Sequence, residues 1–383
     1  MKSFLPMLVL LAGCGETPEV QGPATGGGSY DFSPPTTVGD SDLSSSMSGA
    51  DLSTPAIADL SVPADLSVPA DLGDPIGVDT TVTVFNNLLF DNGHREQRAT
   101  VNLPADGLYK KITLHLTLAC PTGGCDPWDR LASIGLVDGG ADLGPERIIE
   151  LGRFATPYGR GGSWDIDVTD LRPLLAGSRT IKGFIDTWIG PPQGWGLTAQ
   201  LIYVGGVPAN IPIVAMALPW GNFNIGDSQP INNALPPQTV NLPLTVTHAA
   251  VRVTVTGHGQ GNLNNCAEFC SLNHGIVVDG VTAQQQKIWR ADCAQNPVQP
   301  QNGSWKYNRA GWCPGADVKP WRVDLGSRPA SFTVSYELDP YVNTCSPNNC
   351  TASTCALSTP CAYDNGNHTQ PYYALSAIVI GYR

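Results

Sequence analysis

Charge is scarce in this chain, and basic charge is the scarcest. Charged residues make up 14% of the 383 residues, with 21 Lys and Arg against 33 Asp and Glu. Nucleic acid is therefore a poor candidate partner, because a phosphate backbone needs a basic patch. Ten acids and one lysine fall within residues 1–75, so nine of the twelve net negative charges belong to that segment. The remainder of the chain is close to neutral.

Clustered histidines and paired cysteines of the zinc-binding type are also absent. No two histidines are adjacent or separated by one residue, which argues against a copper centre that needs clustered imidazoles. The cysteine spacings lack the C-x2-C pairs of structural zinc sites. No cofactor motif is present either. We therefore expect neither a metal nor a cofactor. The histidines are His94, His115, His248, His258, His274 and His368.

A long apolar run is missing at the N-terminus, although a short one is present. Lys2 precedes an apolar stretch at 4–11 that is too short to cross a bilayer as a helix. Small residues then lead to Cys14, a pattern that resembles a bacterial lipoprotein signal. We expect residues 1–14 to be this signal and Cys14 to carry the lipid. A plain secretory signal is the alternative. The expected location is the envelope or outer surface of a bacterium, with the membrane contacted only through the anchor.

Residues 15–78 are rich in Gly, Ser, Pro, Thr and Asp. The sequence Ala-Asp-Leu-Ser-Val-Pro occurs at 58–63 and again at 64–69. So few apolar side chains cannot offset the entropy of ordering such a segment. We expect a disordered spacer that tethers the following domains, and a binding repeat is the alternative.

Glycine and proline are abundant instead, with 42 and 33 residues, which suits short strands joined by many turns. Alternation of apolar and polar residues with period two predicts antiparallel strands that have one buried and one wet face. The pattern predicts an all-β fold of sandwiches or jelly rolls, with one short helix near 168–175. A junction at 205–208 would separate domains at 79–208 and 209–383. The predicted strands lie at 81–85, 112–118, 147–154, 180–188, 197–204, 250–255, 275–279, 331–336 and 372–382.

Ten of the eleven cysteines remain once Cys14 is set aside, and an even number in an exported chain favours disulfides. The spacing predicts three local pairs, and the last four cysteines form a polar cluster whose pairing stays open. The three pairs are Cys120–Cys125, Cys266–Cys270 and Cys293–Cys313, and the cluster is Cys345, Cys350, Cys355 and Cys361.

Four clusters combine an acid or an arginine with an aromatic ring. The first is Trp128-Asp129-Arg130, directly after the first cysteine pair, and the second is Glu268-Phe269 within another pair. Arg309 and Trp312 form the third, beside Cys313. Asp186 and Trp188 form the fourth, and on a strand they would face the same way. Each cluster alone could be a structural ion pair or a core tryptophan. Together they suit a site for sugars, whose apolar faces lie on rings while carboxylates and arginines bind hydroxyls.

Five motifs that follow one another in the chain resemble the peptide-N-glycosidase F family. The resemblance covers roughly residues 79–383. The family has two adjacent jelly-roll domains and hydrolyses, without a metal, the amide that joins the innermost N-acetylglucosamine to asparagine. The motifs are Cys-Asp-x-Trp-Asp-Arg at 125–130, Gly-Arg-Phe-x-Thr-Pro-Tyr at 152–158, Asp-Ile-Asp-Val-Thr-Asp at 165–170, Cys-Ala-Glu-x-Cys at 266–270 and Arg-Ala-Gly-Trp-Cys-Pro-Gly at 309–315.

This resemblance implies a role for each of the clustered residues. Asp129 matches the primary catalytic acid, Glu268 the second acid, and Asp186 a third acid that is Glu in the family. Arg130 and Arg309 match arginines near those acids. Trp128, Trp188 and Trp312 match aromatic residues of the substrate cleft.

The chain also departs from the family at the predicted substrate site. Asp186 is one methylene shorter than the family's Glu, which puts substrate positioning in doubt. Phe269 and His258 each replace a cleft Trp, and we expect His258 to be a polar cleft residue rather than a catalyst.

The expected function is amide hydrolysis on N-glycosylated peptides and glycoproteins by a monomer. A lipoprotein that binds glycans or adhesion partners without catalysis is the main alternative. A glycosidase that cuts between sugars would also need two carboxylates. A copper monooxygenase is disfavoured by the scattered histidines.

Overall fold

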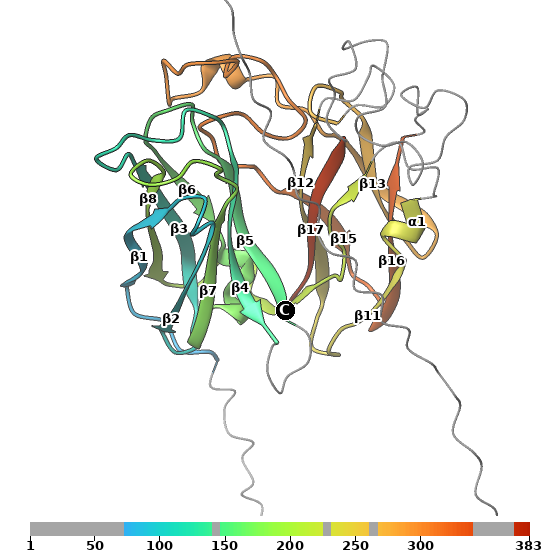
Figure 1. The fold of residues 1–383 in the computed structure, drawn as a ribbon. Helices are drawn as coiled ribbons and strands as arrows, with labels where there is room; N and C mark the ends of the chain where they lie inside the picture. Colours follow the sequence, from blue (N-terminus) through green and yellow to red (C-terminus); the bar gives the residue numbers. More distant parts are fainter. Residues whose placement is uncertain (1–72, 140–145, 225–230, 260–266, 340–370) are drawn as a thin grey trace, which may run out of the picture. The chain divides into compact units, whose positions relative to one another are not determined.

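The computed structural model describes residues 73–139, 146–224, 231–259, 267–339 and 371–383, which form two antiparallel β-sandwiches (Figure 1). Both sandwiches belong to one compact unit. Within the described residues, no helix combines the length and the apolar character that crossing a membrane requires.

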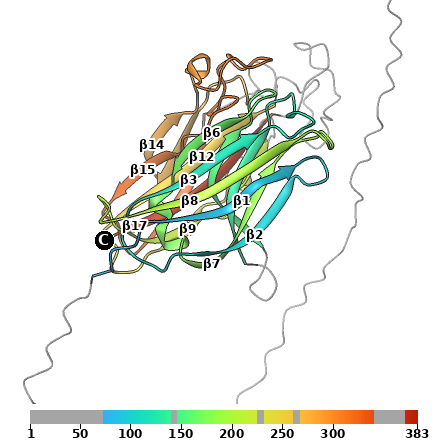
Figure 2. The same cartoon turned by 90° about the vertical axis from the view of Figure 1, so that its left-hand side faces the viewer.

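The first sandwich contains two four-stranded sheets that enclose one apolar core (Figure 2). One sheet has the order β1 (Thr80–Phe90), β8 (Trp195–Gly205), β3 (Tyr109–Ala119) and β6 (Gly162–Asp167). The other has the order β2 (Glu96–Leu103), β7 (Gly177–Ile185), β4 (Leu131–Asp138) and β5 (Arg147–Ala155). The short helix predicted near 168–175 is a 3-10 helix at Thr169–Leu174.

The second sandwich follows from β9 (Pro212–Ala217) onward, on the far side of the predicted junction. Its first sheet has the order β10 (Phe223–Asn224), β17 (Tyr372–Tyr382), β12 (His248–His258) and β15 (Trp321–Gly326), with β9 also paired to β17. Its second sheet has the order β11 (Gln238–Asn241), β16 (Ser331–Leu338), β13 (Asn273–Val278) and β14 (Val281–Lys287). One turn of helix, α1, covers Ile231–Ala234, and a 3-10 turn covers Cys293–Gln295.

The all-β prediction is confirmed, and each predicted strand overlaps an observed one. One strand ends earlier than predicted: the sequence suggested a strand at 180–188, and β7 ends at Ile185. Asp186 and Trp188 therefore lie in the connection after β7, and the prediction that a strand places them on one face is wrong.

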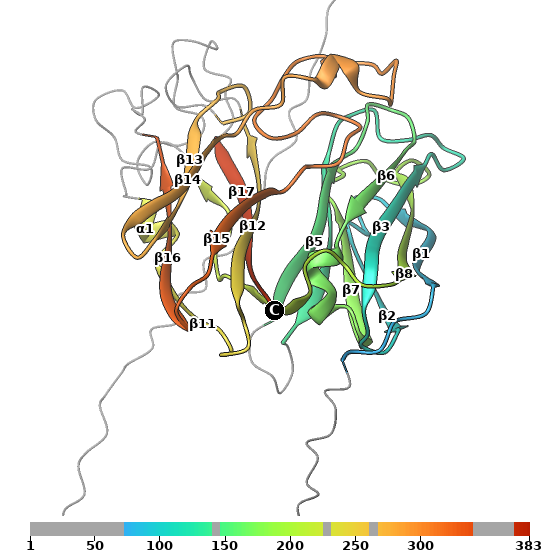
Figure 3. The ribbon, with the colours of Figure 1, turned by 180° about the vertical axis from the view of Figure 1, so that it is seen from behind.

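The prediction of a wet face on residues 250–255 is also wrong. Arg252 is 9% exposed and Thr254 is 7% exposed, although both stand at polar positions of the alternating pattern. Val251, Val253 and Val255 face the core of their own sandwich, while Ala250 belongs to the core of the first sandwich. The sheet that contains β12 and β17 is thus covered on both sides (Figure 3).

A segment of the second sandwich extends the end of β5. Ala155 donates its backbone N–H to Ala316 at 3.0 Å, and Val318 donates to Arg153 at 2.8 Å. The indole N–H of Trp164 also binds the Gly315 carbonyl oxygen at 2.9 Å. These bonds hold the loop that precedes β15 against β5 and β6 of the first sandwich. Asp129, Glu268 and Arg309 lie in loops, outside the strands.

Candidate functional site

Asp126 organises the loop that carries Asp129. The Cys120–Cys125 disulfide closes a short ring immediately before it. The Asp126 carboxylate is fully buried and accepts hydrogen bonds from Arg130 Nε at 2.7 Å and from the Thr187 hydroxyl at 2.7 Å. It also accepts the backbone N–H of Trp128 at 3.0 Å. The ion pair of Arg130 is thus with Asp126, and not with Asp129, its neighbour in the chain.

Asp129 stands on the same loop, and its side chain has little exposure to solvent. Its side chain is 15% exposed, and its nearest cation is the guanidinium of Arg309 at 3.4 Å. Burial raises the pKa of the Asp129 carboxyl, while Arg309 and a hydrogen bond from the Tyr158 hydroxyl oppose that rise. The carboxyl is therefore easier to protonate than an ordinary aspartate.

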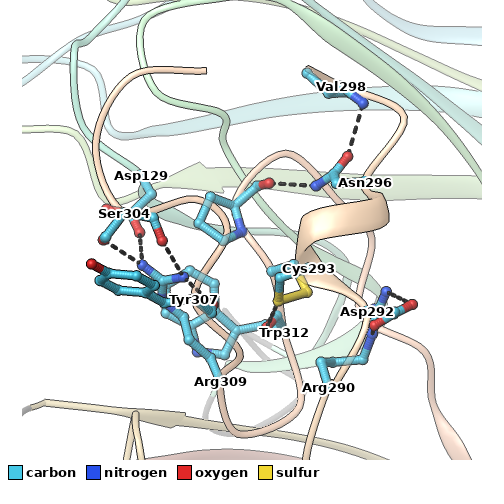
Figure 4. Close-up of a disulfide and its surroundings, with 12 residues drawn as sticks. Asp129, Arg290, Asp292, Cys293, Asn296, Val298, Ser304, Tyr307, Arg309 and Trp312 are labelled. Carbon is cyan, nitrogen blue, oxygen red and sulfur yellow. Dashed lines mark hydrogen bonds and ion pairs between the residues drawn. A yellow bond between two sulfur atoms is a disulfide. The ribbon is translucent and has the colours of Figure 1, made fainter. Parts of the chain in front are cut away.

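Arg309 comes from the second sandwich and binds both candidate acids. Its Nε donates to Glu268 Oε1 at 2.9 Å, and one terminal nitrogen reaches Asp129. The side chain is 1% exposed, and its other donors bind the Tyr307 carbonyl at 2.7 Å and the Ser304 hydroxyl at 2.9 Å. Arg309 is thus held in place by backbone as well as by the two carboxylates. Figure 4 shows Arg309 beside Asp129, Ser304 and Tyr307.

Glu268 is held by backbone on both sides. Its N–H donates to the Gly259 carbonyl at 3.1 Å, and its own carbonyl accepts the N–H of Ala310 at 2.8 Å. Burial raises the pKa of the Glu268 carboxyl, Arg309 opposes the rise, and the charge of Asp129 adds to it. Two acids that share one cation and repel one another favour a state in which one is ionised and the other protonated.

A disulfide and local hydrogen bonds support the segment that carries Arg309. Cys293 is bonded to Cys313, as predicted. Asn296 donates its side-chain amide to the Pro314 carbonyl at 2.5 Å, and the Asn296 side-chain oxygen accepts the Val298 N–H (Figure 4). The indole N–H of Trp312 donates to the Gly257 carbonyl at 2.8 Å, which ties this segment to β12.

The structure places His258 beside this segment, at the end of β12. Its ring stacks on Trp312 with 5.3 Å between centroids and on Tyr372 with 5.2 Å. Burial, with the nearby charges of Arg153 and Arg309, lowers the pKa of His258 to about 3. His258 is therefore neutral at physiological pH.

Asp186 and Trp188 share a different partner, Arg95. The Arg95 guanidinium lies 3.2 Å from Asp186 Oδ1 and 4.2 Å from the centre of a Trp188 ring. Burial raises the pKa of Tyr372, and the charges of Asp186 and Glu268 add to the rise, so both acids lie near the Tyr372 hydroxyl. Asp186 therefore belongs to the same region of the fold, with its side-chain ion pair to Arg95 rather than to Arg309.

The candidate aromatic residues differ in their exposure. Trp128 is 59% exposed, Trp188 is 62% exposed and Phe269 is 38% exposed. Trp312 is buried, and its ring contacts Arg309 at 4.8 Å as well as His258. The first three offer apolar faces to a ligand, while Trp312 supports Arg309 from within the protein.

Four residues of the site were missed by sequence reasoning. Tyr158 lies within the motif at 152–158, and its hydroxyl is 3.0 Å from that of Ser304, beside Arg309. Asp126 also lies within a motif, at 125–130, whereas Arg95 and Ser304 lie outside the motifs, and their partners are set by the folding of loops. In the described part of the chain, no three His, Cys, Asp or Glu side chains are grouped so as to bind a metal ion.

Some of the predicted residues fall outside the described ranges. Cys266 is one, so its pairing with Cys270 stays a prediction. Cys14 and the four cysteines of the cluster at 345–361 also lie outside.

Comparisons with known proteins relate this chain to one family. A family model described as "Peptide-N-glycosidase F, C terminal" matches residues 229–373. The peptide-N(4)-(N-acetyl-beta-D-glucosaminyl)asparagine amidase F of Elizabethkingia miricola is 27% identical in an alignment of 330 residues that covers 79% of this chain and 84% of that protein.

Solved structures agree as well. The structure of PNGase F from Flavobacterium meningosepticum, titled a glycosylasparaginase, superposes with a TM-score of 0.65 at 25% identity. The match covers 80% of this chain and 96% of that one. A structure of PNGF-II, with a TM-score of 0.62 and 17% identity over 79% of this chain and 65% of that one, shares the fold. On its motifs, its sandwiches and these matches, the chain belongs to the peptide-N-glycosidase F family.

Proposed function

We propose that this protein is an amidase that releases N-linked glycans. It hydrolyses the bond between the asparagine side chain and the innermost N-acetylglucosamine, converting Asn to Asp. The observation that carries the proposal is the single buried guanidinium of Arg309 shared by Asp129 and Glu268, two acids whose pKa values are both raised.

This arrangement suits amide hydrolysis. An amide is a weak electrophile, and its nitrogen leaves only when it is protonated. The ionised member of the acid pair takes a proton as water attacks the carbonyl carbon, and the protonated member gives its proton to the nitrogen as the C–N bond breaks. The products are an aspartate and a glycosylamine. A positive charge held close to the carbonyl oxygen of the amide offsets the negative charge that develops on this oxygen.

The surrounding side chains suit a sugar substrate. The exposed rings of Trp128 and Trp188 can each receive the apolar face of a pyranose. Asp186, which is 38% exposed and oriented by Arg95, has a free lone pair for a sugar hydroxyl or amide. Binding by these groups would fix the scissile bond relative to Asp129 and Glu268.

The test is incubation of the purified protein with a denatured N-glycoprotein, followed by mass spectrometry of the peptides. We expect Asn to be converted to Asp at the glycan site and the intact glycan to be released. An N-acetylglucosamine left on Asn would show a cut between sugars. Tight glycan binding with no cleavage after long incubation would favour the non-catalytic binding protein instead.

We also propose export and lipid attachment at Cys14, on the small residues that precede this cysteine after a short apolar run. The expected result is incorporation of a labelled fatty acid into the wild-type protein and none into Cys14→Ser. Equal labelling of both would contradict the proposal.

A further inference from the structure

A chain of buried hydrogen bonds runs from the boundary between the sandwiches to the candidate site. It begins at Arg153 of β5, which is 4% exposed. Arg153 binds Glu150 Oε2 at 2.7 Å, and another of its nitrogens donates to the Thr256 hydroxyl at 2.8 Å and to the Ala374 carbonyl at 2.6 Å. Thr256, which is fully buried, lies 2.8 Å from Nε2 of His258.

The chemistry of this chain assigns the tautomer of His258. A guanidinium only donates, so the Thr256 oxygen accepts from Arg153. The Thr256 proton then needs an acceptor, and Nε2 of His258 lies 2.8 Å from this hydroxyl oxygen. Nε2 accepts only when it carries no proton. The neutral ring therefore carries its proton on Nδ1.

His258 is in turn linked to Arg309 through Trp312. The His258 ring stacks on the indole of Trp312, whose N–H binds the Gly257 carbonyl, next to His258 in the chain. Arg309 lies over the same indole at 4.8 Å. A His258 ring that turned over or gained a proton would disturb the face on which the Arg309 guanidinium rests.

We propose that Arg153 and Thr256 are positioning residues for the reaction: they hold His258 as the neutral Nδ1–H tautomer, and this ring supports Trp312 and Arg309 against Asp129 and Glu268. The reaction in question is the proposed amide hydrolysis, so the kinetic part of the proposal rests on that function. Neither Arg153 nor Thr256 contacts Asp129 or Glu268, and their effect on turnover passes through His258.

The matched variants are Thr256→Val and Thr256→Ser. Valine has the shape of threonine but lacks the hydroxyl, whereas serine keeps it and loses only a methyl group. We expect Thr256→Val to lower kcat on a glycopeptide by about tenfold with KM little changed, since misplacement of catalytic groups costs turnover more than binding. Thr256→Ser should stay within about twofold of wild type, because the hydrogen bonds remain.

Nitrogen NMR of the labelled histidines provides a readout that loss of stability alone would not change. The wild type should show an unprotonated Nε2 for His258, assigned through His258→Gln, and Thr256→Val should lose this signature while Thr256→Ser keeps it. A wild-type His258 with its proton on Nε2 would overturn the proposal. So would equal loss of kcat in both Thr256 variants, or an unchanged kcat in Thr256→Val.

The outcome separates this inference from the proposed function. If the wild type cleaves no glycopeptide, the proposed function fails, and the Nε–H resonance of Arg309 becomes the deciding measurement. A shift of that resonance in Thr256→Val but not in Thr256→Ser supports the positioning role. An Arg309 resonance that is identical in all three proteins overturns it.

Discussion

Replacing Arg309 by methionine should destabilise the protein strongly, and by an amount that depends on pH. Methionine keeps much of the volume and leaves Asp129 and Glu268 without their shared cation. The two acid side chains are only 15% and 16% exposed, so solvent cannot take over the role of the guanidinium. Removing one partner of a buried ion pair costs about 3–5 kcal/mol, and we expect a loss of this size near pH 8.

The pH dependence follows from the raised pKa values of both acids. In the folded protein, burial raises the pKa of each carboxyl above its ordinary value, and Arg309 opposes the rise. Without Arg309 both pKa values rise further. As pH falls, the folded variant binds protons before the unfolded chain does, so its free energy of unfolding increases toward the ordinary acid pKa. The loss of unfolding free energy caused by Arg309→Met should therefore be smaller near pH 5 than near pH 8.

The assay is guanidinium unfolding of both proteins at the two pH values, with the free energy extrapolated linearly and the slope compared. Arg290→Met is the matched control, because the Arg290 backbone N–H binds the Arg309 carbonyl at 2.8 Å but the Arg290 side chain pairs with the largely exposed Asp292. Its loss should be small and similar at both pH values. A loss for Arg309→Met that is below about 1 kcal/mol, or equal at the two pH values, would refute the reasoning.

Three further predictions concern the acids and their neighbours. Asp129→Asn should abolish glycopeptide cleavage while the protein still unfolds cooperatively in calorimetry; a cleaving variant would show that Asp129 is not essential. Tyr158→Phe removes a hydrogen bond that lowers the pKa of Asp129, so the acid limb of the pH profile of kcat/KM should move to higher pH, and an unmoved limb would contradict this. Asp186→Ala should raise the KM for a glycopeptide and change the melting temperature little, because Asp186 is 38% exposed; a large fall in melting temperature with normal KM would make Asp186 structural.

The strands and two of the disulfides could be predicted from the sequence because both depend on local patterns. Alternation identified β3 and β16, and short spacings identified Cys120–Cys125 and Cys293–Cys313. The wet face expected on residues 250–255 failed for a non-local reason. Alternation indicates which face of a strand is polar, but not whether that face is exposed. Arg252 is polar and yet is covered by the other sandwich, where Asp170 and Glu150 are among its charged neighbours.

The same distinction applies to the site. Asp129, Glu268 and Arg309 could be named from their motifs, but their mutual contacts could not. Arg130 adjoins Asp129 in the chain and yet binds Asp126, because the turn after the disulfide brings the side chain back over the loop. The Arg95–Asp186 pair is separated by 91 residues, and no local pattern reports such a partner.

The distribution of the site over two sandwiches has a consequence for folding. Asp129 stands on a loop of the first sandwich, whereas Glu268 and Arg309 stand on loops of the second. The first sandwich alone would expose Asp129, and the second alone would expose Glu268 with Arg309. The pair of acids that share the Arg309 guanidinium therefore forms only when both sandwiches are folded and joined. The buried ladder of bonds from β5 to the loop before β15, together with the Arg153 contacts to β12 and β17, fixes the two sandwiches to one another at this end. Weakening that boundary should therefore impair the acid pair before it unfolds either core.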